Sequence, residues 1–357
     1  MIYLFNSAAN KGYAKNVLNV LHFPKGCENF HHYAINMESN KNSYVQTELI
    51  ERGENIIGEE AIIVCVNKEI VPYQYIPLRK AKISKIKKDQ GRMYFYVEYE
   101  EYCTPKDNDY DKFNKEFVNK FKELLFQSDK YTEDTEFEKN NGGYLAFEGE
   151  SIDNLIDMNS NSWIQTVKYL GKLKVFHESR AIFTKTSIED VKGNVLNKLT
   201  KGKNYTLKMT YYIPFFTTDM DEIKLELVHS ANGSVSIKNN SQQRLNVTHS
   251  NLSFDFLTLD VGECNFSVDL DKTYLIADRG FAVKVSHGTS AWIWIVLLLL
   301  LATIMLYISN DNSNIDSFQN LIGISFSDNV ETGLKILSMI VPTLALWGAG
   351  AIYSKKQ

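Results

Sequence analysis

The sequence predicts a chain in three parts: an α+β N-terminal domain, an all-β immunoglobulin-like sandwich and a C-terminal two-helix transmembrane hairpin. Three observations predict this order. Residues 1–150 mix helical and strand periodicities, residues 201–285 alternate apolar and polar side chains, and residues 286–357 contain two long apolar runs. Residues 151–200 are expected to connect the first two parts. At 357 residues, the chain is long enough for several domains.

The N-terminal part has the pattern of a mixed α/β domain. Short apolar runs at residues 2–5, 61–66 and 94–99 predict strands, and residues 13–21 predict a helix. Residues 111–126 carry apolar side chains at helical spacing between lysines, which predicts an amphipathic helix packed on the sheet. Those apolar side chains are Phe113, Phe117, Val118, Phe121, Leu124 and Leu125.

Period-two alternation marks the next part of the chain. In residues 205–213 apolar side chains occupy every second position, and the pattern returns in short segments up to residue 285. About seven such segments, separated by Asn, Gly, Ser and Asp, predict a β-sandwich of the immunoglobulin-like type. The alternation slips by one residue between Phe256 and Leu257, which predicts a β-bulge.

Two apolar runs predict membrane-spanning helices at residues 291–308 and 334–353. At ~1.5 Å per residue, each run crosses most of a ~30 Å hydrocarbon layer. Aromatic side chains mark the ends of the first run, where a membrane interface would lie. In the second run Pro342 predicts a kink, and small side chains predict close helix packing. The small residues are Ala345, Gly348 and Ala349.

The distribution of charge predicts a protein of the bacterial inner membrane with both termini in the cytoplasm. Residues 309–332, between the two runs, contain four acidic residues and no Lys or Arg, whereas basic residues flank the outer ends of both runs. The first ten residues lack the pattern of a signal peptide, which also favours a cytoplasmic N-terminus. Six Asn-X-Ser/Thr triplets offer the alternative of a glycosylated ectodomain, which would require export.

Most catalytic and cofactor signatures are absent from the sequence. It contains no phosphate-binding glycine loop, no zinc-protease or deaminase motif and no nucleophile elbow. Because the histidines and cysteines also lack metal-ligand spacing, we expect no cofactor, no metal site and no enzyme. The cysteines are expected to be buried thiols of a reducing compartment. They are Cys27, Cys65, Cys103 and Cys264.

One basic patch stands out in a chain whose net charge is −4. Seven cations lie within fourteen positions: Arg79, Lys80, Lys82, Lys85, Lys87, Lys88 and Arg92. Aromatic residues flank them, among which Tyr94 and Tyr96 are included in the predicted site. Clustered cations beside aromatic rings suit a phosphate backbone whose bases stack on the rings, which predicts a site for a nucleotide or single-stranded DNA. Two alternatives are a solvated edge hairpin, in which lysines discourage strand pairing, and a contact with anionic lipid.

The segment between the two apolar runs predicts a further functional element. Residues 318–326 are mostly apolar around Gly323, inside the acidic segment. Two spans that bracket such a segment are found in simple channels, where a re-entrant loop lines the pore. The alternative is an ordered turn or an interfacial helix. Because two spans form a pore only by oligomerising, the channel hypothesis requires a homo-oligomer.

The whole plan, a cytosolic mixed domain, a β-sandwich and a two-helix hairpin without catalytic motifs, resembles bacterial antiphage membrane effectors. Among these it is most similar in outline to the membrane effectors of the Hailong defence system. The resemblance implies a tetrameric channel that oligodeoxyadenylate, made by a partner nucleotidyltransferase, holds closed until infection releases it. It also implies that the basic patch binds the DNA signal and that the terminal helices form the pore.

The primary hypothesis is therefore a membrane effector of antiphage defence, an oligomeric channel that depolarises the membrane when a nucleotide or oligonucleotide gates it. The alternatives are a membrane-tethered binding or scaffold protein without a pore, and an anchored enzyme with an unfamiliar site. A pore should be toxic on overexpression, and substitutions at Gly323, Ala345 or Gly348 should remove that toxicity. A tether should tolerate those changes, and an enzyme should stay active after removal of residues 286–357.

Overall fold

The computed structural model divides the chain into two compact units. The first comprises Met1–Asn197, Asn204–Leu257 and Cys264–Val283, and the second comprises Lys198–Lys203, Thr258–Glu263 and Lys284–Gln357. The residues that the structure describes are 1–7, 11–35, 44–70, 73–125, 145–158, 163–178, 181–214, 223–229, 234–238, 241–245, 247, 249–270, 279–288 and 300.

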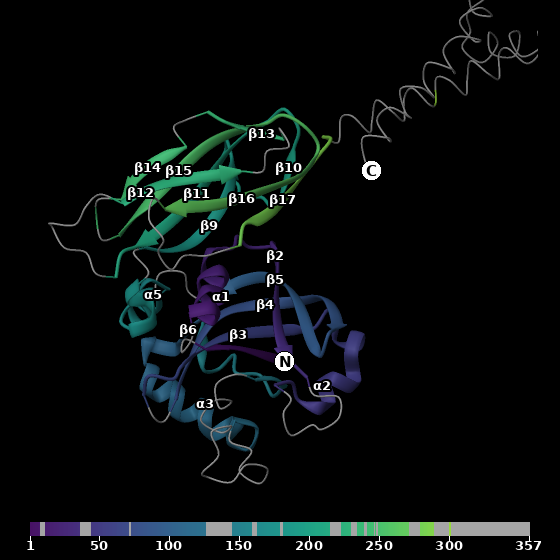
Figure 1. Cartoon of the computed structure of the whole chain (residues 1–357), viewed down its shortest axis with the longest axis vertical. Coiled ribbons are helices and arrows are strands. Elements are labelled where there is room, and N and C mark those ends of the chain that lie inside the picture. Colours follow the sequence, from purple (N-terminus) through teal and green to yellow (C-terminus); the bar gives the residue numbers. More distant parts are fainter. Residues whose placement is uncertain are drawn as a thin grey trace, which may run out of the picture. The chain divides into compact units, whose positions relative to one another are not determined.

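A six-stranded sheet forms the centre of the N-terminal part, with the strand order β2-β5-β4-β3-β1-β7 (Figure 1). β1 and β3 are parallel, and the other neighbouring strands of this sheet are antiparallel. The predicted strands at residues 2–5, 61–66 and 94–99 are confirmed, since they fall in β1, β3 and β5. The strands are β1 (Ile2–Ser7), β2 (Glu28–Ala34), β3 (Glu60–Asn67), β4 (Gln74–Asp89), β5 (Arg92–Tyr102) and β7 (Ala146–Glu148).

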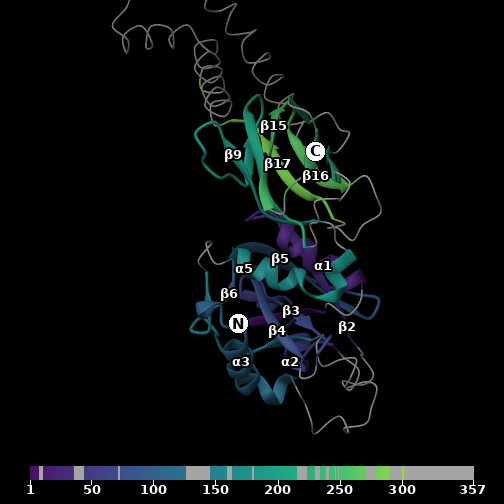
Figure 2. The same cartoon turned by 90° about the vertical axis from the view of Figure 1, so that its left-hand side faces the viewer.

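Helices α1 (Lys11–His22) and α3 (Tyr110–Leu125) lie on opposite sides of this sheet (Figure 2). α3 is the predicted amphipathic helix, and its Phe117 contacts the rings of Tyr3 and Phe5 on β1. Tyr3 and Phe5 share one face because side chains of a strand alternate. That face is buried under α3 over β1, β3 and the beginning of β4. The outer part of the same face, over β2 and β5, is where the predicted site lies.

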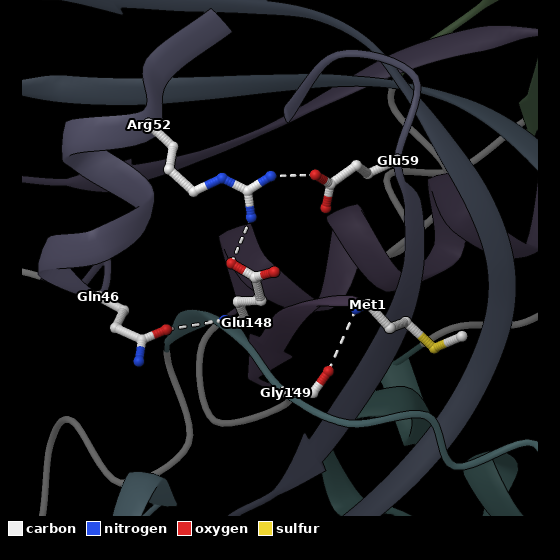
Figure 3. Close-up of polar contacts among 6 residues, drawn as sticks. All are labelled: Met1, Gln46, Arg52, Glu59, Glu148 and Gly149. Atoms are coloured by element: carbon white, nitrogen blue, oxygen red, sulfur yellow. Dashed lines mark hydrogen bonds and ion pairs between the residues drawn. The ribbon is translucent and has the colours of Figure 1, made fainter. Parts of the chain in front are cut away.

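Polar contacts fasten the edge of the sheet at β7 (Figure 3). Arg52 ends the short helix α2 (Thr47–Arg52) and forms ion pairs with Glu59 and Glu148. The Gln46 Oε1 atom accepts the Glu148 amide at 2.8 Å. The N-terminal ammonium of Met1 donates to the carbonyl of Gly149 at 3.2 Å. The contacts to Glu148 and Gly149 join residues far apart in sequence and fix the position of β7, although partly exposed ion pairs add little stability.

Residues 151–200, expected as a connection, contain α5 (Trp163–Gly171), η4 (Lys174–Glu178), β9 (Ile182–Asp190) and β10 (Lys198–Thr200). β9 pairs antiparallel with β11 (Asn204–Tyr212) and is therefore a strand of the sandwich. The alternation of β9 is hidden in the sequence because Thr184 and Thr186 occupy buried positions. Thr184 is satisfied there, since its hydroxyl accepts a hydrogen bond from the Trp163 indole at 2.7 Å.

The alternating part of the chain folds into a β-sandwich, as predicted. One sheet has the order β10-β17-β16-β12-β14 and the other the order β13-β15-β11-β9. Phe256 of β15 and Phe266 of β16 meet between the sheets, with ring centroids 5.1 Å apart. The remaining strands are β12 (Ile223–His229), β13 (Val235–Ile237), β14 (Gln242–Leu245), β15 (His249–Thr258), β16 (Gly262–Leu270) and β17 (Phe281–Ser286).

The predicted bulge between Phe256 and Leu257 is wrong. β15 pairs with β11 in continuous register through both residues. Thr258 takes the next buried position, where its hydroxyl donates to the carbonyl of Thr200 at 2.7 Å. A polar residue can keep the alternation because the strand offers it a hydrogen-bond partner. The slip in the sequence therefore reflects a buried threonine and no change of register.

In the described part of the chain, no helix combines the length and the apolar character needed to cross a membrane. The predicted spans at residues 291–308 and 334–353 lie outside the described residues, apart from Leu300. The predicted packing and pore residues also lie outside them; these are Gly323, Pro342, Ala345, Gly348 and Ala349. The hairpin thus stays a prediction from the sequence.

Candidate functional site

A long hairpin of β4 and β5 positions most of the predicted site. Asp89 pairs with Arg92, and the two residues between them, Gln90 and Gly91, both have positive φ, at 47° and 71°. This is the geometry of a type I′ turn, which matches the twist of the two strands. β5 also pairs with β2, so the outer sheet consists of three antiparallel strands.

The register of these strands gathers aromatic rings on one face. Phe30 of β2 pairs with Tyr96 of β5, and His32 pairs with Tyr94. The ring centroids of Phe30 lie 5.7 Å from Tyr96 and 5.8 Å from Tyr94, and those of His32 and Tyr94 lie 5.5 Å apart. All four side chains are partly exposed. We call these four residues the aromatic face.

Cations surround the aromatic face. Lys85 pairs across from Tyr96 and its Nζ atom lies 5.3 Å from the ring centroid, and Lys87 lies in the same relation to Tyr94 at 6.0 Å. Arg279 covers Phe30, with its Cζ atom 3.9 Å from the ring centroid. These are the geometries of cation–π contacts. The face therefore offers π surface and positive charge together.

His32 contributes an aromatic ring, since its imidazole is held in the neutral form. Burial lowers its pKa, and the positive charges of Arg92 and Arg279 lower it further. Lys87 behaves in the opposite way, because its hydrogen bond to Asp89 at 2.7 Å raises the pKa of its ammonium. Near pH 7 His32 thus presents a neutral ring and Lys87 a charged ammonium.

Acidic residues bound the aromatic face at one end. Glu28 of β2 pairs with Glu98 of β5, and Lys82 of β4 pairs with Glu98. Ser84 donates a hydrogen bond to Glu28 at 2.5 Å. A phosphate would be repelled there, because two carboxylates outnumber the one lysine. Anion binding is therefore favoured at the turn end, around Lys85, Lys87 and Arg92.

Two of the predicted cations do not belong to this exposed surface. Arg79 is buried at 1% exposure on the opposite face of β4, where its guanidinium donates to the carbonyls of Val20, Phe23 and Glu100. Lys80 is nearly buried and forms an ion pair with Asp153. Both cations have structural roles because β4 is buried from Tyr75 to Ala81, and only its later residues form the exposed hairpin with β5. The cluster of charges in the sequence concealed this buried run.

Lys88 is exposed but lies on the other face of the hairpin. It pairs with the buried Met93 and donates to the carbonyl of Ile50 at 2.5 Å. The structure thus brings together Lys85, Lys87, Arg92, Tyr94 and Tyr96 from the predicted site. Lys82 shares their face but lies toward its acidic end.

Sequence reasoning missed three residues of the site, Phe30, His32 and Arg279. The alternation of β2 contains a signal for the first two, since Phe30 and His32 are separated by the buried His31. Adjacent histidines conceal this pattern because both look polar. Arg279 is separated from β2 by about 250 residues, so no local pattern could have placed it.

The thiols of the described chain are shielded from solvent. All four cysteines are buried, and burial raises the pKa of Cys27 and Cys103 to about 12, which keeps both as unreactive thiols. Among the described residues, no three His, Cys, Asp or Glu side chains are placed to hold a metal ion.

Comparison with known proteins gives limited similarity. No protein-family model and no curated protein matches the chain. Domains 4 and 5 of the S-layer protein SbsC match at 12% identity and a TM-score of 0.18, over 30% of this chain and 53% of that chain.

Two further solved structures match a similar share of the chain. The CARDB domain of the PF1109 protein from Pyrococcus furiosus, in complex with di-metal ions, matches at 12% identity and a TM-score of 0.20, over 29% of this chain and 94% of that one. A conjugative transposon lipoprotein from Bacteroides eggerthii matches at 14% identity and a TM-score of 0.18, over 29% and 96%. The similarity is too low to inform function.

Proposed function

We propose that the aromatic face binds a nucleotide or a single-stranded oligonucleotide, and that the chain is the sensor and effector of a membrane-depolarising response. The proposal rests on one observation: aromatic rings and cations lie together on one partly exposed face. The rings are Phe30, Tyr94 and Tyr96, and the cations are Lys85 and Lys87. Bases would stack on the rings while phosphates contact the lysines. This combination is the usual means by which proteins bind single strands.

The energies of such contacts suffice for binding. Base–aromatic stacking contributes roughly 1–3 kcal/mol per base, and a cation over a ring adds roughly 0.5–1 kcal/mol at an exposed site. Two stacked bases would therefore contribute roughly 2–6 kcal/mol, a substantial share of the about −8 kcal/mol of a micromolar complex. Each phosphate contact also makes the affinity decrease with salt.

The effector part of the proposal rests on the sequence. The runs at residues 291–308 and 334–353 would form a hairpin in the bacterial inner membrane, preceded by a sandwich of the immunoglobulin-like type, with both termini in the cytoplasm. Copies of the chain would assemble, as a tetramer in the family that it resembles, to form a pore. The oligonucleotide signal would come from a partner nucleotidyltransferase, and antiphage defence would be the biological role.

Fluorescence anisotropy of the full chain in detergent tests the binding step. The probe is a short fluorescein-labelled single-stranded DNA of mixed sequence. Tyr96→Ala should weaken binding about tenfold or more, the loss of one stacked base, whereas Tyr96→Phe should retain affinity because it keeps the ring. Lys85→Glu should weaken binding and flatten its salt dependence. If all three variants bind as the parent does, the aromatic face is not the site.

A dye that reports membrane potential tests the effector step. Expression of the full chain in bacteria should depolarise the cells, and removal of residues 286–357 should abolish this. Expression of the Tyr96→Ala variant in place of the parent should change the depolarisation if ligand binding controls the pore. If the chain binds anionic vesicles but not the oligonucleotide, the aromatic face is a lipid contact. If the chain binds the oligonucleotide but no variant depolarises the cells, a tether is favoured.

A further inference from the structure

Arg279 touches the aromatic face from a distant part of the chain. Its guanidinium lies over the Phe30 ring at 3.9 Å and donates to the Asn29 Oδ1 atom and the Phe30 carbonyl, both at 2.8 Å. Its backbone amide donates to the Asn19 Oδ1 atom of α1 at 3.1 Å. One residue therefore joins α1, β2 and the aromatic face, and it lies two positions before β17 begins at Phe281.

The residues after Arg279 are also fastened to the N-terminal part. The Phe281 ring lies 5.5 Å from His22 and 6.2 Å from Phe23, at the end of α1. The Cys27 thiol donates to the carbonyl of Ala282 at 3.7 Å and is only 4% exposed. Arg279 is therefore one of three successive contacts that hold the start of β17, and its release would weaken the cover over Cys27.

No side chain larger than that of glycine fits at position 280. A Cβ atom there would lie 2.8 Å from the carbonyl oxygen of Phe266, which is closer than real contacts allow. The backbone between Arg279 and Phe281 thus runs directly against β16. A shift of the Arg279 backbone would therefore carry the start of β17 with it.

A base stacked on the side of Phe30 that Arg279 covers would occupy the place of the guanidinium. Both cannot lie on that side of the ring, since the Cζ atom is already at the distance of contact. Along the chain, β17 ends at Ser286, and the first apolar run begins at residue 291. The competition for Phe30 therefore acts on the strand that leads into the predicted membrane segment.

We propose that Arg279 is the coupling residue of this protein: a ligand base displaces it from Phe30 and thereby releases the start of β17. The inference rests on the proposed function, because it presumes a ligand on the aromatic face. It adds the regulation of that site: a base stacked on Phe30 and the contact of Arg279 that holds the start of β17 exclude each other.

The native cysteines provide the readout. The full chain in detergent is treated with a maleimide, with and without the short single-stranded DNA of mixed sequence, and modified cysteines are identified by peptide mass spectrometry. Cys27 should be modified about tenfold faster with the DNA, the ratio expected for loss of one partly buried cation–π contact. Cys65, in the centre of the sheet at 0% exposure, is the internal reference.

Variants separate coupling from binding. Arg279→Gln should raise the Cys27 rate without DNA and make that rate insensitive to DNA at DNA concentrations that anisotropy shows to saturate the variant. Arg279→Lys should restore part of the coupling because it keeps a cation that can lie over the ring. Arg244→Gln, at an exposed position of β14 in the sandwich, is the matched control and should behave as the parent.

The outcomes are distinguishable. If anisotropy shows no DNA binding to the parent, the proposed function fails and the coupling fails with it. If DNA binds but the Cys27 rate does not change, the coupling is refuted while the binding site stands. An Arg279→Gln chain whose Cys27 rate equals that of the parent without DNA also refutes the coupling, independently of any ligand.

Discussion

Replacing Arg79 by alanine is expected to lower the free energy of unfolding by about 4 kcal/mol, at the upper end of single-residue effects, because it breaks a buried hydrogen-bond network. Its guanidinium donates to the carbonyls of Val20, Phe23 and Glu100 at 3.2, 2.5 and 2.6 Å. It also lies 4.3 Å from the centroid of the Tyr102 ring.

The magnitude follows from what the deletion leaves behind. Hydrogen bonds to a charged group contribute roughly 1.5–3 kcal/mol each, and a buried carbonyl without a partner costs roughly 1–3 kcal/mol. The desolvation of the guanidinium offsets part of this sum. Two of the accepting carbonyls belong to the end of α1 and the residue after it, where helix carbonyls lack intrahelical donors.

Pulse proteolysis of the full chain in increasing urea measures this loss. Lys88→Ala is the matched control, since the Lys88 ammonium is exposed, and it should change stability by less than about 0.5 kcal/mol. The prediction separates two roles of Arg79. A variant that keeps the stability of the parent to within about 1 kcal/mol but loses affinity for the oligonucleotide would refute the structural role.

Three further perturbations have defined outcomes. Burial lowers the pKa of His22 to about 4 and that of His31 to about 3, whereas a histidine of the unfolded chain has a pKa near 6.5. The stability present above pH 6.5 should therefore fall by about 1.4 kcal/mol per pH unit for each group as the pH drops toward 4. Urea unfolding at several pH values measures this loss. Arg52→Gln should cost only about 1 kcal/mol in the same measurement, because its ion pairs with two carboxylates are about one-third exposed. Gly348→Leu in the second apolar run should reduce depolarisation without changing DNA affinity, as measured by dye and anisotropy, if small residues pack the pore.

The elements with clear periodicity could be predicted from the sequence. The strands at residues 2–5 and 61–66 and the helix at 111–126 follow from runs of apolar side chains at the spacing of each structure. The sandwich follows from alternation in the same way. β9 was missed and a bulge in β15 was wrongly predicted for one reason: buried threonines such as Thr184 and Thr258 interrupt the apolar pattern, and only tertiary hydrogen bonds allow them to be buried.

The candidate site was predicted in part. The sequence placed cations and tyrosines in one hairpin, and the register confirms that Lys85 and Lys87 face Tyr96 and Tyr94. It could not separate Arg79 from these lysines, because composition does not show which cation has carbonyls around it.

The sequence by itself determined the local periodicities, the apolar runs near the C-terminus and the positive charge of the β4–β5 hairpin. The tertiary structure decided which residues share a face and which distant segments meet there. Phe30 reaches Tyr96 through strand pairing, and Arg279 reaches Phe30 although about 250 residues of sequence separate them. The physical reason is that periodicity is a local property of the chain, whereas burial and contact depend on how the elements pack against one another.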